Sequence, residues 1–194
     1  MRSLRLVDVH RGTDHIVASC ALDDLRFHVT VWYEDLDLDA LARQLGDDAI
    51  ERIAVHIALF QLNAACSLRP DTIELGRYAR HLTSDLVQLW RTVFHHVWAQ
   101  WRYEHDLPAY DGPRFVDPVA PPAAPLRAPE GPVELLAYCG GGKDSLVALK
   151  LLERAGLPFA TLGYAHSIYG PGEPQHELLD RIGSASARVR AERQ

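Results

Sequence analysis

An apolar run that ends in three glycines and is followed at once by an amphipathic run constrains the fold of this chain more than any other feature. The stretch reads VELLAYCGGGKDSLVALKLLERAG, from Val133 to Gly156. Leucines at helical spacing predict a helix, and Gly156 before Leu157-Pro158 predicts its end. We therefore expect a buried strand, a tight loop and a helix whose broad apolar face includes Leu146, Val147, Leu149, Leu151 and Leu152. The apolar residues from Phe159 to Tyr164 predict a second, parallel strand.

The loop has the composition of an anion-binding site. Glycines allow a backbone to approach a ligand closely, and the amides and dipole of a helix N-terminus attract anions. Lys143 adds a positive charge, and Asp144 and Ser145 suit the N-cap and the first helical turn. A glycine-rich turn without any ligand is the alternative. The predicted phosphate site comprises Gly140, Gly141, Gly142, Lys143, Asp144 and Ser145.

Two common phosphate loops do not fit this spacing. A Walker A loop requires Gly-Lys-Ser/Thr, but Asp144 follows Lys143, and Ala137 occupies the position of its first glycine. A dinucleotide-binding fingerprint requires Gly-x-Gly-x-x-Gly, but Ser145 occupies the position of the third glycine after Gly140. Both classes are therefore excluded.

The segment Gly140-Gly141-Gly142-Lys143-Asp144-Ser145 resembles the PP-loop of the ATP pyrophosphatases, whose pattern is Ser-Gly-Gly-x-Asp-Ser after the first strand of a parallel sheet. The difference is Gly140, which removes a hydroxyl donor. The resemblance implies an α/β domain of the adenine nucleotide alpha-hydrolase type that cleaves ATP between the α- and β-phosphates. Lys143 and the glycine amides would hold pyrophosphate, Ser145 would donate to a phosphate, and Asp144 would help to hold Mg²⁺ or cap the helix.

His166 follows the second expected strand of this domain. In parallel sheets the carboxyl ends of the strands face the ligand crevice, so His166 is the candidate titrating residue beside the nucleotide, with Lys143 and Asp144 as the other candidate catalytic residues. An ordinary polar residue at a strand end is an equally good interpretation of His166.

The first hundred residues predict a mixed α+β domain. Alternating or apolar runs predict strands at Leu4–Val9, His15–Leu22 and Leu25–Tyr33, with a turn at Asp23-Asp24. The acidic stretch Glu34 to Asp39 is interpreted as a solvated turn rather than a metal site, with Asp39 capping a helix that runs through Leu45. Further helices are expected from Asp47 to Cys66, burying residues that include Phe60 and Ala64, and from Ser84 to His105, where three of the four tryptophans form an aromatic stripe typical of a core.

Eight of the twelve prolines fall between residues 106 and 132. Proline cannot serve in a helix interior or a central strand, so this run is interpreted as an interdomain linker. The expected organisation is an α+β domain over 1–105, a linker over 106–132, the start of a PP-loop domain over 133–182 and a disordered tail over 183–194. Because such sheets typically have about five strands, we expect an incomplete copy of the nucleotide domain with an exposed apolar edge.

Composition narrows the cellular setting. The net charge of −6 argues against binding of nucleic acid through bulk electrostatics. The cysteines at 20, 66 and 139 show no paired spacing, which fits a reducing cytoplasm, and the longest uncharged run, Ala54 to Leu68, is too short for a membrane span. The oligomeric state stays open.

A closer resemblance joins the two halves. The segments FHVTVWYEDLDLDALA, ALFQLNAACSLRPDTIEL and VWAQWRYEHDLP, followed by prolines and CGGGKDSLVALKLL, resemble the MurL family. This family comprises UDP-N-acetyl-α-D-muramoyl-L-alanyl-L-glutamate epimerases of peptidoglycan synthesis. The resemblance implies a nucleotide-sugar peptide substrate, ATP and Mg²⁺, adenylation of the terminal glutamate, and release of AMP and pyrophosphate. Another PP-loop enzyme, acting in tRNA thiolation or amidation, and an inactive nucleotide-binding module are the alternatives.

Overall fold

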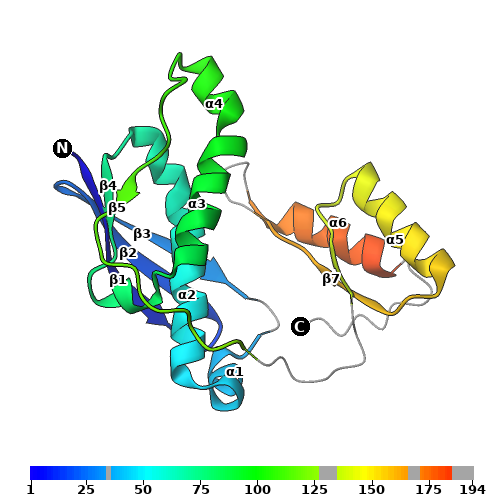
Figure 1. The fold of residues 1–194 in the computed structure, drawn as a ribbon. Coiled ribbons are helices and arrows are strands. Elements are labelled where there is room, and N and C mark those ends of the chain that lie inside the picture. Colours follow the sequence, from blue (N-terminus) through cyan, green and yellow to red (C-terminus); the bar gives the residue numbers. More distant parts are fainter. Residues whose placement is uncertain (34–35, 127–134, 166–170, 185–194) are drawn as a thin grey trace. The chain divides into compact units, whose positions relative to one another are not determined.

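The chain divides into two units in the computed structural model, Met1–Leu126 and Arg127–Gln194 (Figure 1). The structure describes residues 1–33, 36–126, 135–165 and 171–184. Each unit has its own hydrophobic core.

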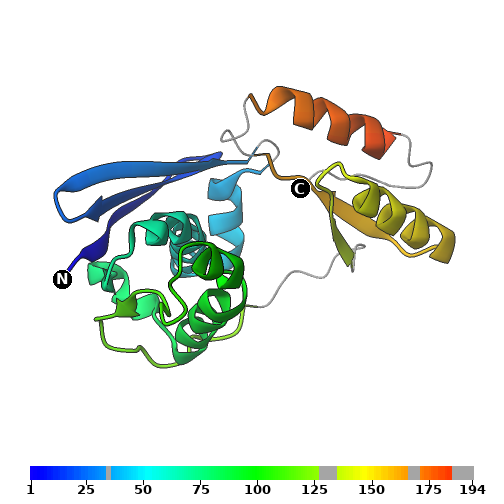
Figure 2. The same ribbon diagram turned by 90° about the horizontal axis from the view of Figure 1, so that it is seen from above.

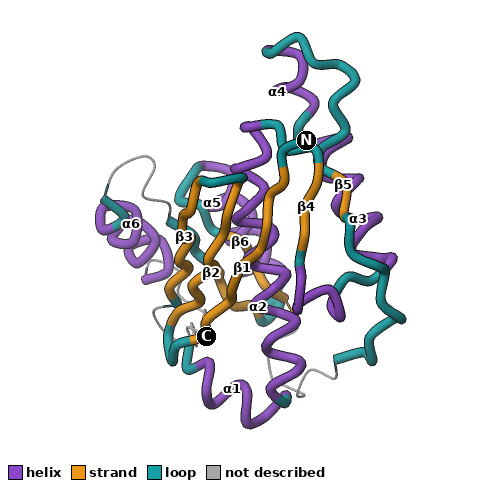
Figure 3. Tube along the Cα trace, turned by 90° about the vertical axis from the view of Figure 1, so that its left-hand side faces the viewer, coloured by secondary structure: helices purple, strands orange, loops and turns teal. Residues whose placement is uncertain are grey.

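A five-stranded sheet in the order β3-β2-β1-β4-β5 forms the frame of the first unit (Figure 3). Three strands pair antiparallel through adjacent hairpins, because Asp23 takes a positive φ of 52° in the two-residue turn that sequence predicted. The two short strands then extend the sheet parallel to β1 on its other side. The strands are β1 (Ser3–Arg11), β2 (His15–Leu22), β3 (Leu25–Trp32), β4 (Thr72–Glu74) and β5 (Arg114–Phe115).

Helices cover one face of this sheet (Figure 2). Alternate β2 side chains, Ile16, Ala18 and Cys20, are buried beneath them, as a period of two requires. The aromatic stripe contributes Trp90, Phe94 and Trp98 to the same core, which confirms its structural role. The helices are α1 (Leu38–Leu45), α2 (Asp47–Leu62), α3 (Ser84–His96) and α4 (Ala99–Glu104), with 3₁₀ turns η1 (Asn63–Leu68) and η2 (Gly76–His81).

Three details of the helices differ from the predictions. Asp37, not Asp39, caps α1, and its carboxylate accepts a hydrogen bond from the Ala40 amide at 2.8 Å. The helix expected to reach Cys66 becomes a 3₁₀ turn after Leu62. Phe60 and Ala64, which were expected to be buried, are exposed.

The third predicted helix is broken between His96 and Ala99. The amides of Val97 and Trp98 both donate to the Val93 carbonyl, at 2.8 and 3.3 Å, which interrupts the regular ladder. The Trp98 indole then donates to Asn63 Oδ1 at 2.7 Å, so a partly buried hydrogen bond holds the break in place.

The proline-rich segment is not a linker over most of its length, which corrects the predicted boundary near His105. Its residues Arg114 and Phe115 form β5, which pairs with Thr72 and Ile73 of β4. The amide of Ala120 donates to the Leu82 carbonyl at 2.7 Å, and both Phe115 and Tyr110 pack against the main core. The physical reason is that an edge strand tolerates flanking prolines, since its outer amides need no partner. Residues 106–126 therefore belong to the first unit.

The described residues of the second unit form two parallel strands and two helices, as the sequence predicted for the strands and the first helix. Its small core consists of Cys139, Leu149 and Phe159, against which Leu152, Leu179 and Ile182 pack. The elements are β6 (Leu135–Tyr138), α5 (Lys143–Ala155), β7 (Phe159–Leu162) and α6 (Glu173–Ser184).

Exposure in the second unit departs from a buried parallel sheet. Of the broad α5 face that we expected to be covered, Leu146, Val147 and Leu151 are exposed. The β6 residues Leu136 and Tyr138 are exposed as well, although this strand was expected to be buried. The last helix, α6, includes residues 183 and 184 of the expected tail, while 185–194 lie outside the described residues.

The fold as a whole is mixed α and β, in agreement with the predicted class at that level. Two parallel strands with two helices do not distinguish an adenine nucleotide alpha-hydrolase sheet from other α/β arrangements, so that assignment stays a prediction. Across the part of the chain that the structure describes, every helix is too short or too polar to cross a membrane.

Candidate functional site

The glycine loop connects the end of β6 to the start of α5. Cys139 is buried at the strand end, Gly141 takes a φ of 81°, and Gly142 is the residue that precedes the helix. The Gly140 amide donates to Ser145 Oγ at 3.2 Å, so the serine hydroxyl closes the loop on itself. The strand, loop and helix predicted from sequence are therefore confirmed as structural elements.

The helix N-terminus in this loop has no side-chain cap. Gly142 occupies the N-cap position, and Asp144 lies in the first turn without capping it. The first amides of a helix lack intrahelical partners, and here the described residues supply none to those of Lys143, Asp144 and Ser145. These amides form the anion-receptive end of the helix dipole.

The charged side chains of the loop are accessible. Lys143 and Asp144 are both exposed, and Ser145 is half-buried by its contact with Gly140. Groups of three or more histidine, cysteine or carboxylate side chains with metal-binding geometry do not occur in the described ranges. A single free carboxylate at this position still fits Mg²⁺, which commonly takes one or two protein carboxylates and completes its shell with phosphate oxygens and water.

Helix α6 packs against the loop, a contact that sequence reasoning missed. A Cβ atom on Gly141 would meet Leu178 Cδ2 at 2.9 Å, and one on Gly163 would meet Leu179 Cδ1 at 2.5 Å. Adjacent leucines at 178 and 179 were the available signal, but their target could not be read from spacing. Packing therefore accounts for Gly141 without any ligand.

The other two glycines have no such structural reason. A Cβ atom on Gly140 or Gly142 would meet nothing within 4 Å, and neither residue takes a positive φ. Open space above these two positions is what close approach of a ligand requires. The interpretation as a bare turn explains one glycine of the three.

The remaining candidate, His166, lies outside the described residues, as does Ser167. Just before them, the Tyr164 carbonyl accepts a hydrogen bond from Gln175 Nε2 at 3.2 Å, so the end of β7 is tied to the start of α6. The structure brings together residues 140–145 as one loop and leaves the placement of His166 a prediction.

These observations define a mixed α/β protein with an uncapped, glycine-lined helix N-terminus in its second unit. Residues 8–185 match the family model described as the MurL N-terminal domain, and the chain belongs to the MurL family. The match runs through the proline-rich segment and the glycine loop, so the family's N-terminal region includes both units. No curated protein and no solved structure matches the chain.

Proposed function

We propose that this chain takes part in the ATP-dependent epimerisation of the terminal L-glutamate of UDP-N-acetylmuramoyl-L-alanyl-L-glutamate, a step of peptidoglycan precursor synthesis. Membership of the MurL family supports the epimerase chemistry. The observation that supports the use of ATP is the uncapped glycine loop with open space at Gly140 and Gly142. The substrate is a nucleotide-sugar peptide and the compartment the cytoplasm; the acidic net charge of −6 makes nucleic acid a poor partner.

In this proposal the loop binds the phosphates of ATP. Backbone N–H groups at the start of α5 donate to the phosphates, Lys143 adds a mobile positive charge, and Ser145 donates to a phosphate oxygen. Asp144 holds Mg²⁺, which neutralises charge on the departing pyrophosphate when it is bound. Lys143 and Asp144 are exposed at the helix start, as these roles require.

The chemistry follows from the need to acidify a carbon–hydrogen bond. A carboxylate oxygen of the terminal glutamate attacks the α-phosphorus of ATP, and the bond to the β-phosphate breaks to release pyrophosphate. The resulting acyl adenylate makes the adjacent α-proton easier to remove than it is beside a carboxylate. A base takes this proton, a proton returns on the opposite face, and water then releases AMP. We assign this base to no residue of the chain, and His166 is the candidate titrating residue beside the nucleotide.

Nucleotide binding is tested by calorimetry with Mg·ATP. Lys143→Ala and Asp144→Ala should each weaken binding by roughly 1.5–3 kcal/mol, the value of one charge-assisted contact. Arg154→Ala is the matched control, because Arg154 is an exposed cation at the opposite end of the same helix. Wild-type affinity for Mg·ATP in both loop variants would show that the nucleotide does not bind at this loop.

The reaction is tested with the muramoyl dipeptide substrate and Mg·ATP in deuterated water. We expect AMP and pyrophosphate as products, a D-glutamate terminus and deuterium at the α-carbon. ADP as product would contradict the mechanism. AMP without deuterium would retain ATP pyrophosphatase chemistry and exclude the epimerase.

A nucleotide-binding module without turnover is the second candidate, favoured by Gly140 in place of the usual serine. It predicts that calorimetry detects Mg·ATP while pyrophosphate is never released. Another PP-loop activity, in tRNA thiolation or amidation, predicts pyrophosphate release with a different second substrate.

A further inference from the structure

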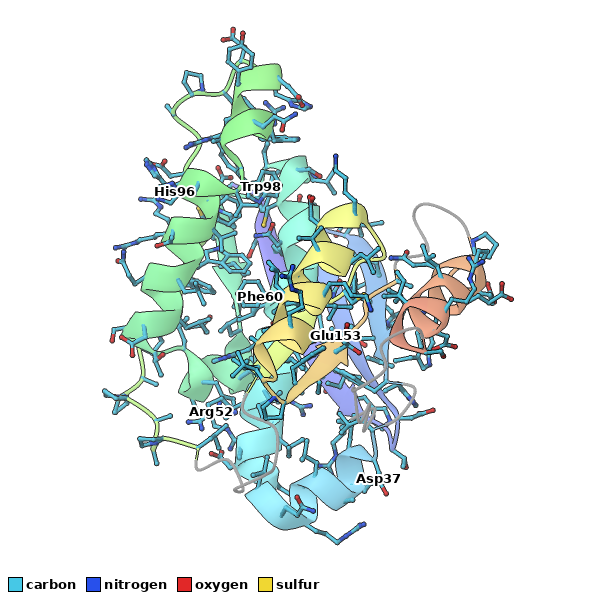
Figure 4. All side chains as sticks on the ribbon, turned by 90° about the vertical axis from the view of Figure 1, so that its right-hand side faces the viewer. Asp37, Arg52, Phe60, His96, Trp98 and Glu153 are labelled. Carbon is cyan, nitrogen blue, oxygen red and sulfur yellow. The ribbon has the colours of Figure 1, made fainter. Side chains whose placement is uncertain are left out.

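A groove of about 990 Å³ lies in the first unit, and its lining includes no residue of the glycine loop. One wall is the outer side of α3, and the other is the segment 109–119 of the proline-rich stretch. His96 of α3, labelled in Figure 4, lines this groove and is exposed. The volume is at the upper end of the range typical of small-molecule sites.

The two walls each contribute an arginine without an ion-pair partner. Arg91 belongs to α3 and Arg114 to β5, and neither forms a salt bridge with any residue that the structure describes. His95 lies one helical turn after Arg91 and therefore on the same side of α3. Its ring contacts that of His96, with centroids 4.6 Å apart. Cationic and titratable groups thus face the groove from both sides.

The carboxylates that line the groove are already engaged. Asp117 accepts the amide of Leu75 at 2.6 Å, and Asp71 accepts the amide of Arg2 at 2.6 Å. Asp111 lies 3.6 Å from the Arg102 guanidinium. Each acid therefore has a donor of its own, although Asp71 and Asp117 keep their negative charges because their donors are neutral amides. Arg91 and Arg114 are the cations of the lining that have no ion-pair partner among the described residues.

Aromatic side chains form the apolar part of the lining. The rings of Trp90 and Phe115 lie 5.8 Å apart, and Phe115 is half-buried. Trp90 is 2% exposed, and its indole Nε1 has no hydrogen-bond partner. Buried indole N–H groups usually have a partner, so this donor is unusual beside an open groove.

The wall opposite α3 is held in place before any ligand binds. Gly112 takes a φ of 80° directly against the Phe94 ring, where a Cβ would approach to 2.5 Å. The Tyr110 hydroxyl donates to the Cys66 carbonyl at 3.1 Å, and the Arg114 amide donates to the Asp71 carbonyl at 3.1 Å. A fixed wall reduces the entropic cost of binding.

We propose that this groove is a second ligand site, which takes a small molecule carrying an oxyanion, phosphate or carboxylate, joined to a planar ring. Arg91 and Arg114 bind the oxyanion from opposite walls, and the ring lies against Phe115. Guanidinium groups suit this role because their planar fork donates two parallel hydrogen bonds to either oxyanion. The site does not depend on the glycine loop or on the proposed epimerase reaction.

The test follows the indole and histidine NMR signals of the full chain during titration with UDP, which joins a planar ring to two phosphates. The Trp90 signal is assigned with Trp90→Phe. We expect UDP to shift the signals of Trp90 and His95, and Arg91→Gln and Arg114→Gln each to weaken its binding about tenfold or more. Arg26→Gln is the matched control, since Arg26 is an exposed arginine of β3 outside the groove.

Titrations with pyrophosphate and with citrate distinguish a phosphate ligand from a carboxylate ligand. Shifts with pyrophosphate but not citrate identify a phosphate ligand, and the reverse identifies a carboxylate; either result supports the site. Lys143→Ala must leave the shifts unchanged, because that residue belongs to the glycine loop. Absence of shifts with every anion at millimolar concentration, equal binding of uridine and UDP, or wild-type affinity in both arginine variants would overturn the proposal.

Discussion

Gly141 and Gly142 are neighbours in the glycine loop, and we expect alanine to destabilise the second unit more at Gly141 than at Gly142. Gly141→Ala places a Cβ at a φ of 81° and 2.9 Å from Leu178. A left-handed conformation costs a non-glycine residue roughly 1–2 kcal/mol, and displacement of Leu178 adds to this cost. Amide exchange of α5 and α6, which reports the local stability of the second unit, should therefore become faster in this variant.

Gly142→Ala supplies the comparison. Gly142 has a φ of −84° and open space around its Cβ position, so alanine adds no strain or clash there and should cost only about 0.5–1 kcal/mol, because it is a poorer N-cap residue than glycine. Equal exchange rates in the two variants would mean that α6 does not pack against the loop as described.

His56 in α2 makes the stability of the first unit depend on pH. Burial, the largest influence, lowers the pKa of this imidazole below its ordinary value of 6.5, the charges of His81 and Arg52 act in the same direction, and a hydrogen bond with the His81 backbone opposes them. Its Nε2 atom is buried without a partner. The unfolded chain therefore binds a proton more readily than the folded one, and the free energy of unfolding should fall as pH decreases below about 6.5.

Urea unfolding between pH 7.5 and 5 measures this dependence. His56→Gln should flatten the loss of stability over this range, because glutamine does not titrate. His10→Gln, at an exposed position of β1, should retain the wild-type slope. An unaltered slope in His56→Gln would assign the dependence to other groups.

At the scale of elements, the strands were the most predictable part of the chain. His15–Leu22 was predicted to the residue, because alternation and the Asp23-Asp24 turn act locally on one hairpin. The end of α2 and the break in α3 were not predictable, because a tertiary hydrogen bond between Trp98 and Asn63 joins residues 35 positions apart. The spacing of apolar residues along a helix does not predict such a bond.

The proline-rich segment shows the same limit from composition. Prolines at 113 and 118 correctly indicated that no central strand or helix could form there. The two residues of β5 fit between them only because the neighbouring β4 offers an edge, and that edge is formed by residues 42 positions earlier. The prolines therefore correctly predicted that no helix or central strand forms in this segment. The interpretation of the segment as a linker was wrong, because it packs against the main core.

The candidate site was predictable to the extent that it is contiguous. Residues 140–145 act through backbone geometry that their own sequence determines, so the loop could be located without the fold. The contacts of Leu178 with Gly141, and the groove between α3 and residues 109–119, join distant segments and needed the structure.

At the scale of the molecule, the boundary between the units predicts which fragment folds alone. A fragment of residues 1–126 keeps β5, Tyr110 and Phe115 against the main core. A fragment of residues 1–105 loses them and uncovers Trp90 and Phe94, whose rings contact Phe115 and Tyr110. We expect cooperative thermal unfolding of 1–126 by circular dichroism, and a much lower midpoint or no transition for 1–105.

A second measurement tests the reason for that difference. Phe115→Ala within 1–126 should cost about 2–4 kcal/mol, somewhat less than a fully buried phenylalanine, because Phe115 is half-buried. Equal stability of the two fragments would mean that residues 106–126 act as a linker and do not stabilise the first unit.

The central place of β1 in the sheet has a consequence for how the chain is made. The first strand to leave the ribosome can pair with β2 almost at once, but its other edge waits for Thr72–Glu74, and that strand in turn waits for Arg114–Phe115. Contacts across such separations form late and slowly. Until Thr72–Glu74 have been synthesised, the nascent sheet ends in an unsatisfied row of amides and carbonyls along Ser3 to Arg5. The newborn chain is thus most prone to mispairing along the edge of β1 that β4 covers in the finished protein.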